Sequence, residues 1–170
     1  MNNQQKRNEL IAAHDNMRSH LYRMIDGLTQ ELLQKKISDE ENSPDILSII
    51  MHIGGAETYC FHKTNHDIAP KFTIEKCEDI HVKLVENTEG IRRVLETCPE
   101  DQLNIVLPSQ DRGPSVAWCL LRTYQHGLYH TAQIAKIRHM ISAPPIEEKP
   151  DTWSVAVDSV IDILCRFWND

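Results

Sequence analysis

Apolar residues recur along much of the chain at alternating spacings of four and three, the period of an α-helix with one buried face. The pattern is clearest over residues 5–34, where the stripe runs Leu10, His14, Met17, Leu21, Met24, Leu28 and Leu32. It predicts one long helix whose stripe packs against other helices. Strand-like alternation is confined to the short stretch LNIVLP at residues 103–108. The chain is therefore predicted to be all-α.

Three further long helices are predicted. The second begins at Pro44 and runs to about residue 63, because Ser43 is a typical N-cap residue and proline is favoured at the first helical position. The third spans about 73–97 and ends before Pro99, since proline disfavours helix in the residue that precedes it. The fourth runs over about 115–142.

The connections are short enough that consecutive helices should be neighbours, which favours an antiparallel up-down four-helix bundle. We predict a single domain over residues 1–170, with the bundle at about 5–142, a proline-rich linker at 143–151 and an additional C-terminal helix at 152–169. The last helix could cover the bundle or pair two subunits as a homodimer. Its apolar face comprises Trp153, Val157, Val160, Leu164 and Phe167.

Composition narrows the classes of function. The net charge of −7 would repel phosphate backbones, so nucleic-acid binding is disfavoured. No apolar run approaches the roughly 20 residues that a membrane span needs, and the N-terminus lacks the apolar core of a signal peptide. We therefore expect a cytoplasmic protein without a membrane partner. Its five cysteines, an odd number without a C-x-x-C pair, are expected to be reduced and mostly buried.

Candidate chemistry lies in the stretch HGLYH, where His126 and His130 are four residues apart and so project from one face of a helix. The spacing alone is weak evidence for a metal site. With nine histidines in 170 residues, about half a pair is expected by chance at any fixed separation. The helix face is more informative, since it also carries apolar residues and should point inward. A second such pair, His62 and His66, falls in the polar stretch FHKTNHDIAP and is expected at the surface.

A third imidazole is predicted from the second helix. His52 shares a face with Ile49, Ala56 and Tyr59. Its depth in its helix differs by only about one turn from that of His126, so the imidazoles can meet if both helices start at the same end of the bundle, as an up-down topology requires. His66 would be about 21 Å further along the axis.

The other candidates are weaker. His14 is expected at the far end of the bundle, and His81 is a fourth, core-facing candidate. Glu57 lies about 140° around the helix from His52 and is expected beside the site or at the surface. The competing interpretation of the triad is a set of buried histidines satisfied by hydrogen bonds.

Three stretches, GLTQELL, SPDILSIIMHIGGAETY and SVAWCLLRTYQHGLYHTAQIAKIR, resemble the DinB-like (DinB/YfiT) metalloprotein superfamily over most of the chain up to about Ile141. The resemblance implies a four-helix bundle with one divalent metal ion held by His52, His126 and His130. The family often has Arg-Gly-Gln after the last histidine, where this chain has Thr131, Ala132 and Gln133. Only Gln133 matches this pattern. The two departures, at Thr131 and Ala132, leave the histidine triad intact.

Three imidazoles without a fourth protein ligand are typical of an open, catalytic metal site. Such donors suit zinc or nickel best here, with iron, copper or manganese as further candidates. The resemblance implies a metal-dependent thiol S-transferase that joins a low-molecular-weight thiol to an electrophile. The alternatives are a non-enzymatic metal-binding or stress-associated protein and a metal-dependent hydrolase. Pocket candidates are Tyr22, Asp26, Tyr59 and Gln133.

Overall fold

A computed structural model describes residues 1–40, 43–109 and 111–146. The expected helix at 152–169 and its role in a dimer lie outside these residues. The described residues form helices and no strand, so the all-α prediction is confirmed, and residues 103–108 are not a strand. The elements are α1 (Asn3–Ile25), α2 (Gln30–Gln34), α3 (Ile46–His62), α4 (Asp79–Thr97), the 3-10 helix η1 (Glu100–Leu103) and α5 (Val116–Met140).

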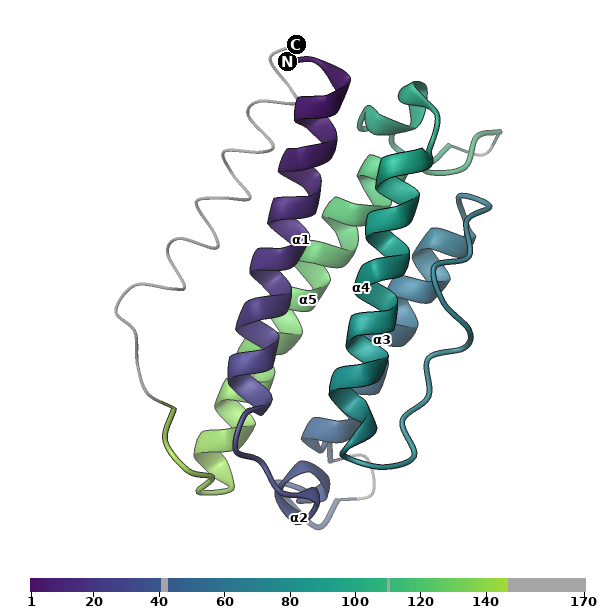
Figure 1. Ribbon diagram of the computed structural model, residues 1–170. Coiled ribbons are helices and arrows are strands. Elements are labelled where there is room, and N and C mark those ends of the chain that lie inside the picture. Colours follow the sequence, from purple (N-terminus) through teal and green to yellow (C-terminus); the bar gives the residue numbers. More distant parts are fainter. Residues whose placement is uncertain (41–42, 110, 147–170) are drawn as a thin grey trace.

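The four long helices lie side by side (Figure 1), and each contacts two others. Helix α1 packs against α4 and α5, and α3 packs against the same two helices. The short helix α2 contacts α3. Helices α3 and α5, which carry the histidines singled out in the sequence, are therefore direct neighbours. No helix among the described residues is both long and apolar enough to cross a membrane.

The prediction of one helix over residues 5–34 was wrong, because α1 ends at Ile25. Gly27 has a φ of +69°, in the left-handed region that favours glycine, and the chain turns there. A new helix then begins with Thr29 as its N-cap, whose side chain accepts a hydrogen bond from the Leu32 amide. The apolar period continues through the turn, so periodicity alone did not reveal it.

The predicted ends of the other helices are confirmed in part. Ser115 caps α5, since its side chain accepts from the Trp118 amide. Helix α3 begins later than predicted, with Asp45 rather than Ser43 as the N-cap, because the Asp45 carboxylate accepts from the Ser48 amide. Helix α4 begins at Asp79 rather than near residue 73.

Residues 64–78 instead form a connection that packs tightly against α3 and α4. A Cβ added to Gly54 would lie 2.5 Å from the Phe72 ring, and one added to Gly90 would lie 1.9 Å from the carbonyl oxygen of Ile68. Both helices therefore need glycine where this segment crosses them. Phe72 and Ile74 are buried and anchor the connection in the core.

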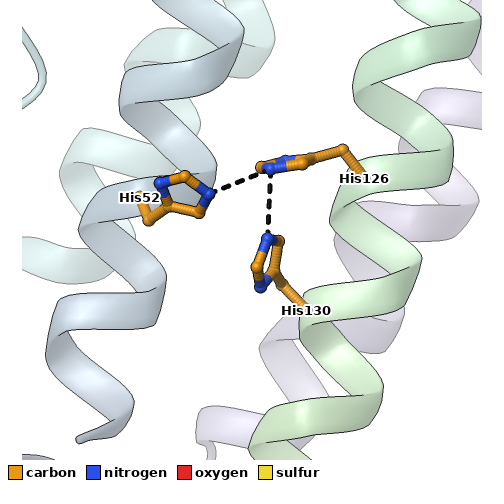
Figure 2. Close-up of side chains that lie close together, drawn as sticks. All are labelled: His52, His126 and His130. Atoms are coloured by element: carbon orange, nitrogen blue, oxygen red, sulfur yellow. Dashed lines mark hydrogen bonds between the residues drawn. The ribbon is translucent and has the colours of Figure 1, made fainter. Parts of the chain in front are cut away.

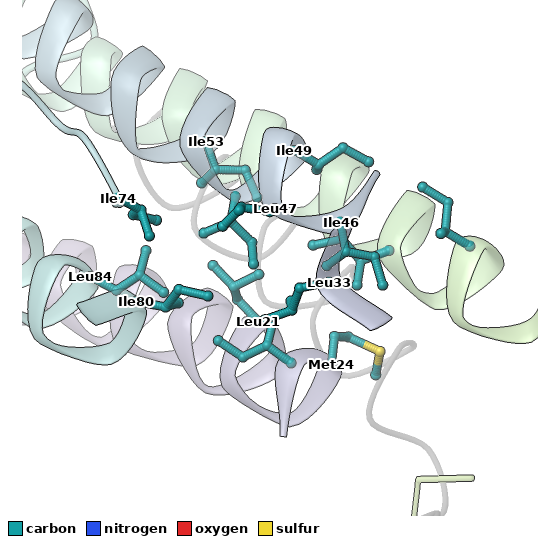
Figure 3. Close-up of a cluster of buried hydrophobic side chains, with 14 of the residues drawn as sticks. Leu21, Met24, Leu33, Ile46, Leu47, Ile49, Ile53, Ile74, Ile80 and Leu84 are labelled. Carbon is teal, nitrogen blue, oxygen red and sulfur yellow. The ribbon is translucent and has the colours of Figure 1, made fainter. Parts of the chain in front are cut away.

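The core has two main apolar clusters. The one drawn in Figure 3 joins α1, α2, α3, α4 and α5 and includes Leu21, Ile46, Ile53 and Leu84. The second includes Leu10, Phe61, Ile91 and Leu120. Along α1, α3 and α4, buried polar residues fall between the members of the two clusters. These are Arg18, Glu57 and Asn87.

Candidate metal centre

Three imidazoles meet between α3 and α5 (Figure 2). The Nε2 atoms of His52 and His126 are 3.0 Å apart, and those of His126 and His130 are 3.1 Å apart. One ring nitrogen from each residue lies within 4.8 Å of the other two, a spacing at which all three could hold one ion. The structure thus brings together the three histidines that the sequence singled out.

Local structure explains how α5 presents its pair. His126 and His130 are one turn apart, so both project toward α3. On another side of the helix, Gly127 is buried, and a Cβ there would lie 2.7 Å from the sulfur of Met17 in α1. Gly127 thus leaves room for the Met17 side chain where α1 packs against α5.

The depth of the site differs from the expectation. His52 is exposed, and His126 and His130 are half-buried rather than inside the core. Tyr59, predicted to share an inward face with His52, is 64% exposed. The inward face of α3 is instead the one that carries Ile50, Ile53 and Glu57. The triad therefore lies at the edge of the α3–α5 pair, where solvent and small molecules have access.

Hydrogen bonds fix the proton on His130. Its Nδ1 lies 2.6 Å from the amide oxygen of Gln133, so Nδ1 carries the proton and donates, and Nε2 is left with a lone pair that faces His126. Gln133 is held in turn, because its amide nitrogen donates to the Tyr129 hydroxyl at 3.2 Å. Partners of this kind orient histidine ligands in metal sites.

Proton counting then argues against a triad satisfied by hydrogen bonds alone. The Nε2 of His126 faces two nitrogens and carries at most one proton when the ring is neutral. If that nitrogen is protonated, it can donate along only one of the two directions. If it is not, its lone pair faces the lone pair of His130. A shared cation would satisfy all three lone pairs at once.

The electrostatic surroundings keep the rings of His126 and His130 neutral. Burial, followed by the positive charges that His130 and His52 would carry, lowers the pKa of His126 to about 4. Burial also lowers the pKa of His130, although the Gln133 hydrogen bond opposes this shift. Neutral imidazole is the form that binds metal ions.

Two of the three nitrogen–nitrogen separations fit a metal site. Zinc–nitrogen bonds of about 2.0–2.1 Å place two ligand nitrogens about 3.3 Å apart at a tetrahedral angle and about 2.9 Å apart at a right angle. The two observed contacts, 3.0 and 3.1 Å, fall between these values. Two of the three ligand pairs therefore already have the spacing that a shared ion requires.

Of the four pocket candidates, Gln133 lies at the triad through its bond to His130. The other three candidates, Tyr22, Tyr59 and Asp26, make their contacts away from the triad. Tyr22 stacks on His81 with ring centroids 5.0 Å apart, and the Lys63 ammonium lies 5.0 Å from the Tyr59 ring. Asp26 caps α1 and is exposed.

Two expectations about other histidines have clear outcomes. His81 was predicted to face the core but is exposed, and its ring stacks on Tyr22 rather than joining the triad. His62 is exposed as predicted and lies 3.0 Å from Asp67, while His66 contacts the Thr64 hydroxyl. The second histidine pair thus makes two separate contacts, of which the one at His66 is half-buried.

The sequence did not predict a buried polar network beneath the triad. Glu57, expected beside the site or at the surface, is 1% exposed. The Nη2 of Arg18 donates to both its carboxylate oxygens, at 2.8 and 2.7 Å, and Asn87 donates to one of them at 3.1 Å. His14, expected at the far end, lies 3.4 Å away through Nε2. One feature of the sequence could have predicted this network. Arg18 is a charged residue that follows His14 by one turn and so lies along the apolar stripe.

The network keeps Glu57 ionised. Burial by itself would raise the pKa of this carboxyl, but the charge of Arg18 and the hydrogen bond and charge of His14 outweigh it. Together they lower the pKa to about 2. A negative charge is therefore held in the core one and a half turns along α3 from His52.

Comparison of the chain with protein-family models, with curated proteins and with solved structures gives no match.

Proposed function

We propose that this protein is a DinB-like metalloprotein that binds one divalent ion through His52, His126 and His130 and acts as a metal-dependent thiol S-transferase. It would attach a low-molecular-weight thiol to an electrophilic small molecule. The observation that carries the metal site is the convergence of three Nε2 atoms whose contacts cannot all be hydrogen bonds. The thiol chemistry rests on the sequence resemblance.

We also infer that α1, α3, α4 and α5 form a four-helix bundle, although their directions do not alternate along the chain as the sequence led us to expect. The end of α3 at Cys60 contacts the start of α5 at Cys119, so these two helices run in opposite directions. Helix α1 runs the same way as α5, because Arg138 near the end of α5 donates to the carbonyl oxygen of Met24 near the end of α1. Helices α3 and α4 both begin in the cluster of Figure 3 and continue into the second cluster, so they also share one direction.

The residues around the triad suit an open site. Three imidazoles supply three donors, and the exposed side of His52 leaves an approach for a small molecule. Zinc or nickel fits these donors best. When bound, a divalent ion in such a site lowers the pKa of a thiol or of water and so supplies a nucleophile at neutral pH.

The chain itself would orient the reactants. Gln133 fixes the ring of His130, and the exposed Tyr129 ring stands edge-on to that ring, with centroids 5.0 Å apart. Tyr129 thus forms a wall beside the triad, against which an apolar part of an electrophile can pack. The buried charge pair of Glu57 and Arg18 supports α3 from the opposite side without being a ligand.

The first experiment is the metal content of the purified protein, measured by mass spectrometry. We expect about one divalent ion per chain in the wild type and in His62→Ala, and none in His126→Ala. His62 is a matched control, because it also belongs to an i,i+4 pair but is exposed and far along α3. Equal binding by His126→Ala and the wild type would rule out the site.

The second experiment tests the reaction. The metal-loaded protein is mixed with a thiol and a chlorinated nitroarene, and conjugation is followed with and without a chelator. Metal-dependent conjugation supports the transferase. Stabilisation by metal without turnover would favour a non-enzymatic metal-binding protein, and ester cleavage that needs no thiol would favour a hydrolase.

A further inference from the structure

A pair of cysteine thiols lies between the same two helices as the triad. Cys60 is near the end of α3 and Cys119 is near the start of α5, 59 residues away in sequence. The Cys119 sulfur lies 3.1 Å from the backbone oxygen of Cys60, and the Cys60 sulfur lies 3.9 Å from the backbone oxygen of Cys119. These reciprocal contacts place each thiol against the other residue, and both are free.

The two thiols differ in access. Cys119 is 0% exposed, whereas Cys60 is half-buried and can be reached by a small molecule. A hydrogen bond with Cys119 lowers the pKa of Cys60, burial opposes that shift, and the charge of Arg122 adds to it. The same hydrogen bond and burial raise the pKa of Cys119. An oxidant would therefore meet Cys60 first, with Cys119 held beside it.

We propose that Cys60 and Cys119 are a site of oxidation, at which a hydroperoxide converts the two thiols into an intramolecular disulfide. In the first step the Cys60 sulfur attacks the peroxide, which is reduced to an alcohol or water while Cys60 becomes a sulfenic acid. In the second step the Cys119 sulfur attacks the Cys60 sulfur and water leaves. The two thiols together lose two electrons, and the peroxide gains them.

The remaining described cysteines are not arranged for this reaction. Cys98 is buried, and its sulfur contacts Arg7 and the Leu95 carbonyl oxygen. Cys77 lies in the connection before α4, among residues of the other apolar cluster. Proximity therefore selects Cys60 and Cys119 as the pair.

The bond would join the two helices that present the triad without touching its ligands. Cys60 follows His52 by eight residues and Cys119 precedes His126 by seven, which places the bond about 11 Å from the imidazoles along the helix axes. The oxidation needs no metal ion, so it can be tested whether or not the triad binds one.

The test treats the reduced, full-length protein with hydrogen peroxide, blocks the remaining thiols by alkylation and measures the intact mass and the proteolytic peptides. Wild type and Cys77→Ser should lose the mass of two hydrogen atoms and yield a linked Cys60–Cys119 peptide. Cys60→Ser should form no such link. In Cys119→Ala, Cys60 should stop at a sulfenic acid that a dione reagent traps.

Two results would overturn the proposal. One is a wild-type protein that loses no mass or links other cysteines, and the other is oxidation of Cys119 in Cys60→Ser. Replacement of the buried Cys119 could loosen the helix pair, so the circular dichroism of each variant is recorded. The linked peptide from the wild type decides the matter even if Cys119→Ala unfolds.

Discussion

The buried Glu57 carboxylate should contribute strongly to stability, and Glu57→Gln tests how much. The side chain is 1% exposed, and the pKa of its carboxyl is about 2 against an ordinary value of 4.5. At about 1.36 kcal/mol per pKa unit, that difference corresponds to about 3 kcal/mol at neutral pH. Glutamine also leaves the Arg18 guanidinium buried without its counter-charge, a loss that typically costs about 3–5 kcal/mol.

The assay is unfolding in urea at pH 7, followed by circular dichroism. Glu57→Gln should lower the free energy of unfolding by about 3–5 kcal/mol. The control is Glu86→Gln, because Glu86 pairs with Lys83 at the surface and should change stability by less than about 1 kcal/mol. A loss below about 1 kcal/mol in Glu57→Gln would refute the argument from burial and charge.

The dependence on pH provides a second check. Because folding lowers the pKa of Glu57, its contribution is complete above the unfolded value of 4.5 and is lost as the pH falls through about 2. The wild type should therefore lose stability steeply across this interval. Glu57→Gln lacks the titrating group, so its stability should change less over the same range.

Three further predictions concern the triad, a close contact and the cysteine pair. Gln133→Ala should weaken metal binding by about ten- to a hundredfold in a competition titration, whereas Gln125→Ala on the exposed side of α5 should not. Gly90→Ala should lower the urea midpoint, because its Cβ would lie 1.9 Å from a backbone oxygen, whereas Gly55→Ala meets nothing within 4 Å and should not. The Cys60–Cys119 disulfide should raise the free energy of unfolding by up to about 4 kcal/mol, measured in urea with and without reductant.

Local signals in the sequence were enough for the helical class and for several helix ends. The cap at Ser115 involves a residue only three positions away, so a short stretch of sequence specifies it. The break at Gly27 was missed because the apolar period runs through it, although a glycine there was visible. Helix α4 was predicted to begin too early, since Ile74 is buried by tertiary packing of a connection and not by a helix.

Part of the triad could be predicted from local geometry, because the i,i+4 spacing places His126 and His130 on one face. The depth argument for His52 assumed that α3 and α5 begin at the same end of the bundle, and that premise was wrong, since the end of α3 lies at the start of α5. The three side chains meet because His52 and His126 both lie near the middle of their helices. The structure brings the three Nε2 atoms together. That they bind a metal ion stays a prediction.

What the sequence by itself determined was the helical class, the faces of α1 and α5 and the set of histidines that could meet. The tertiary structure decided how α3 is rotated. The stretch SIIMHIGGA is apolar on nearly every side, so its periodicity allowed either His52 or Glu57 to face inward. Contacts with Arg18 and Asn87, 39 and 30 residues away, turn Glu57 into the core and leave His52 at the edge. Pairing of a buried charge is a long-range requirement, and for that reason no local pattern revealed it.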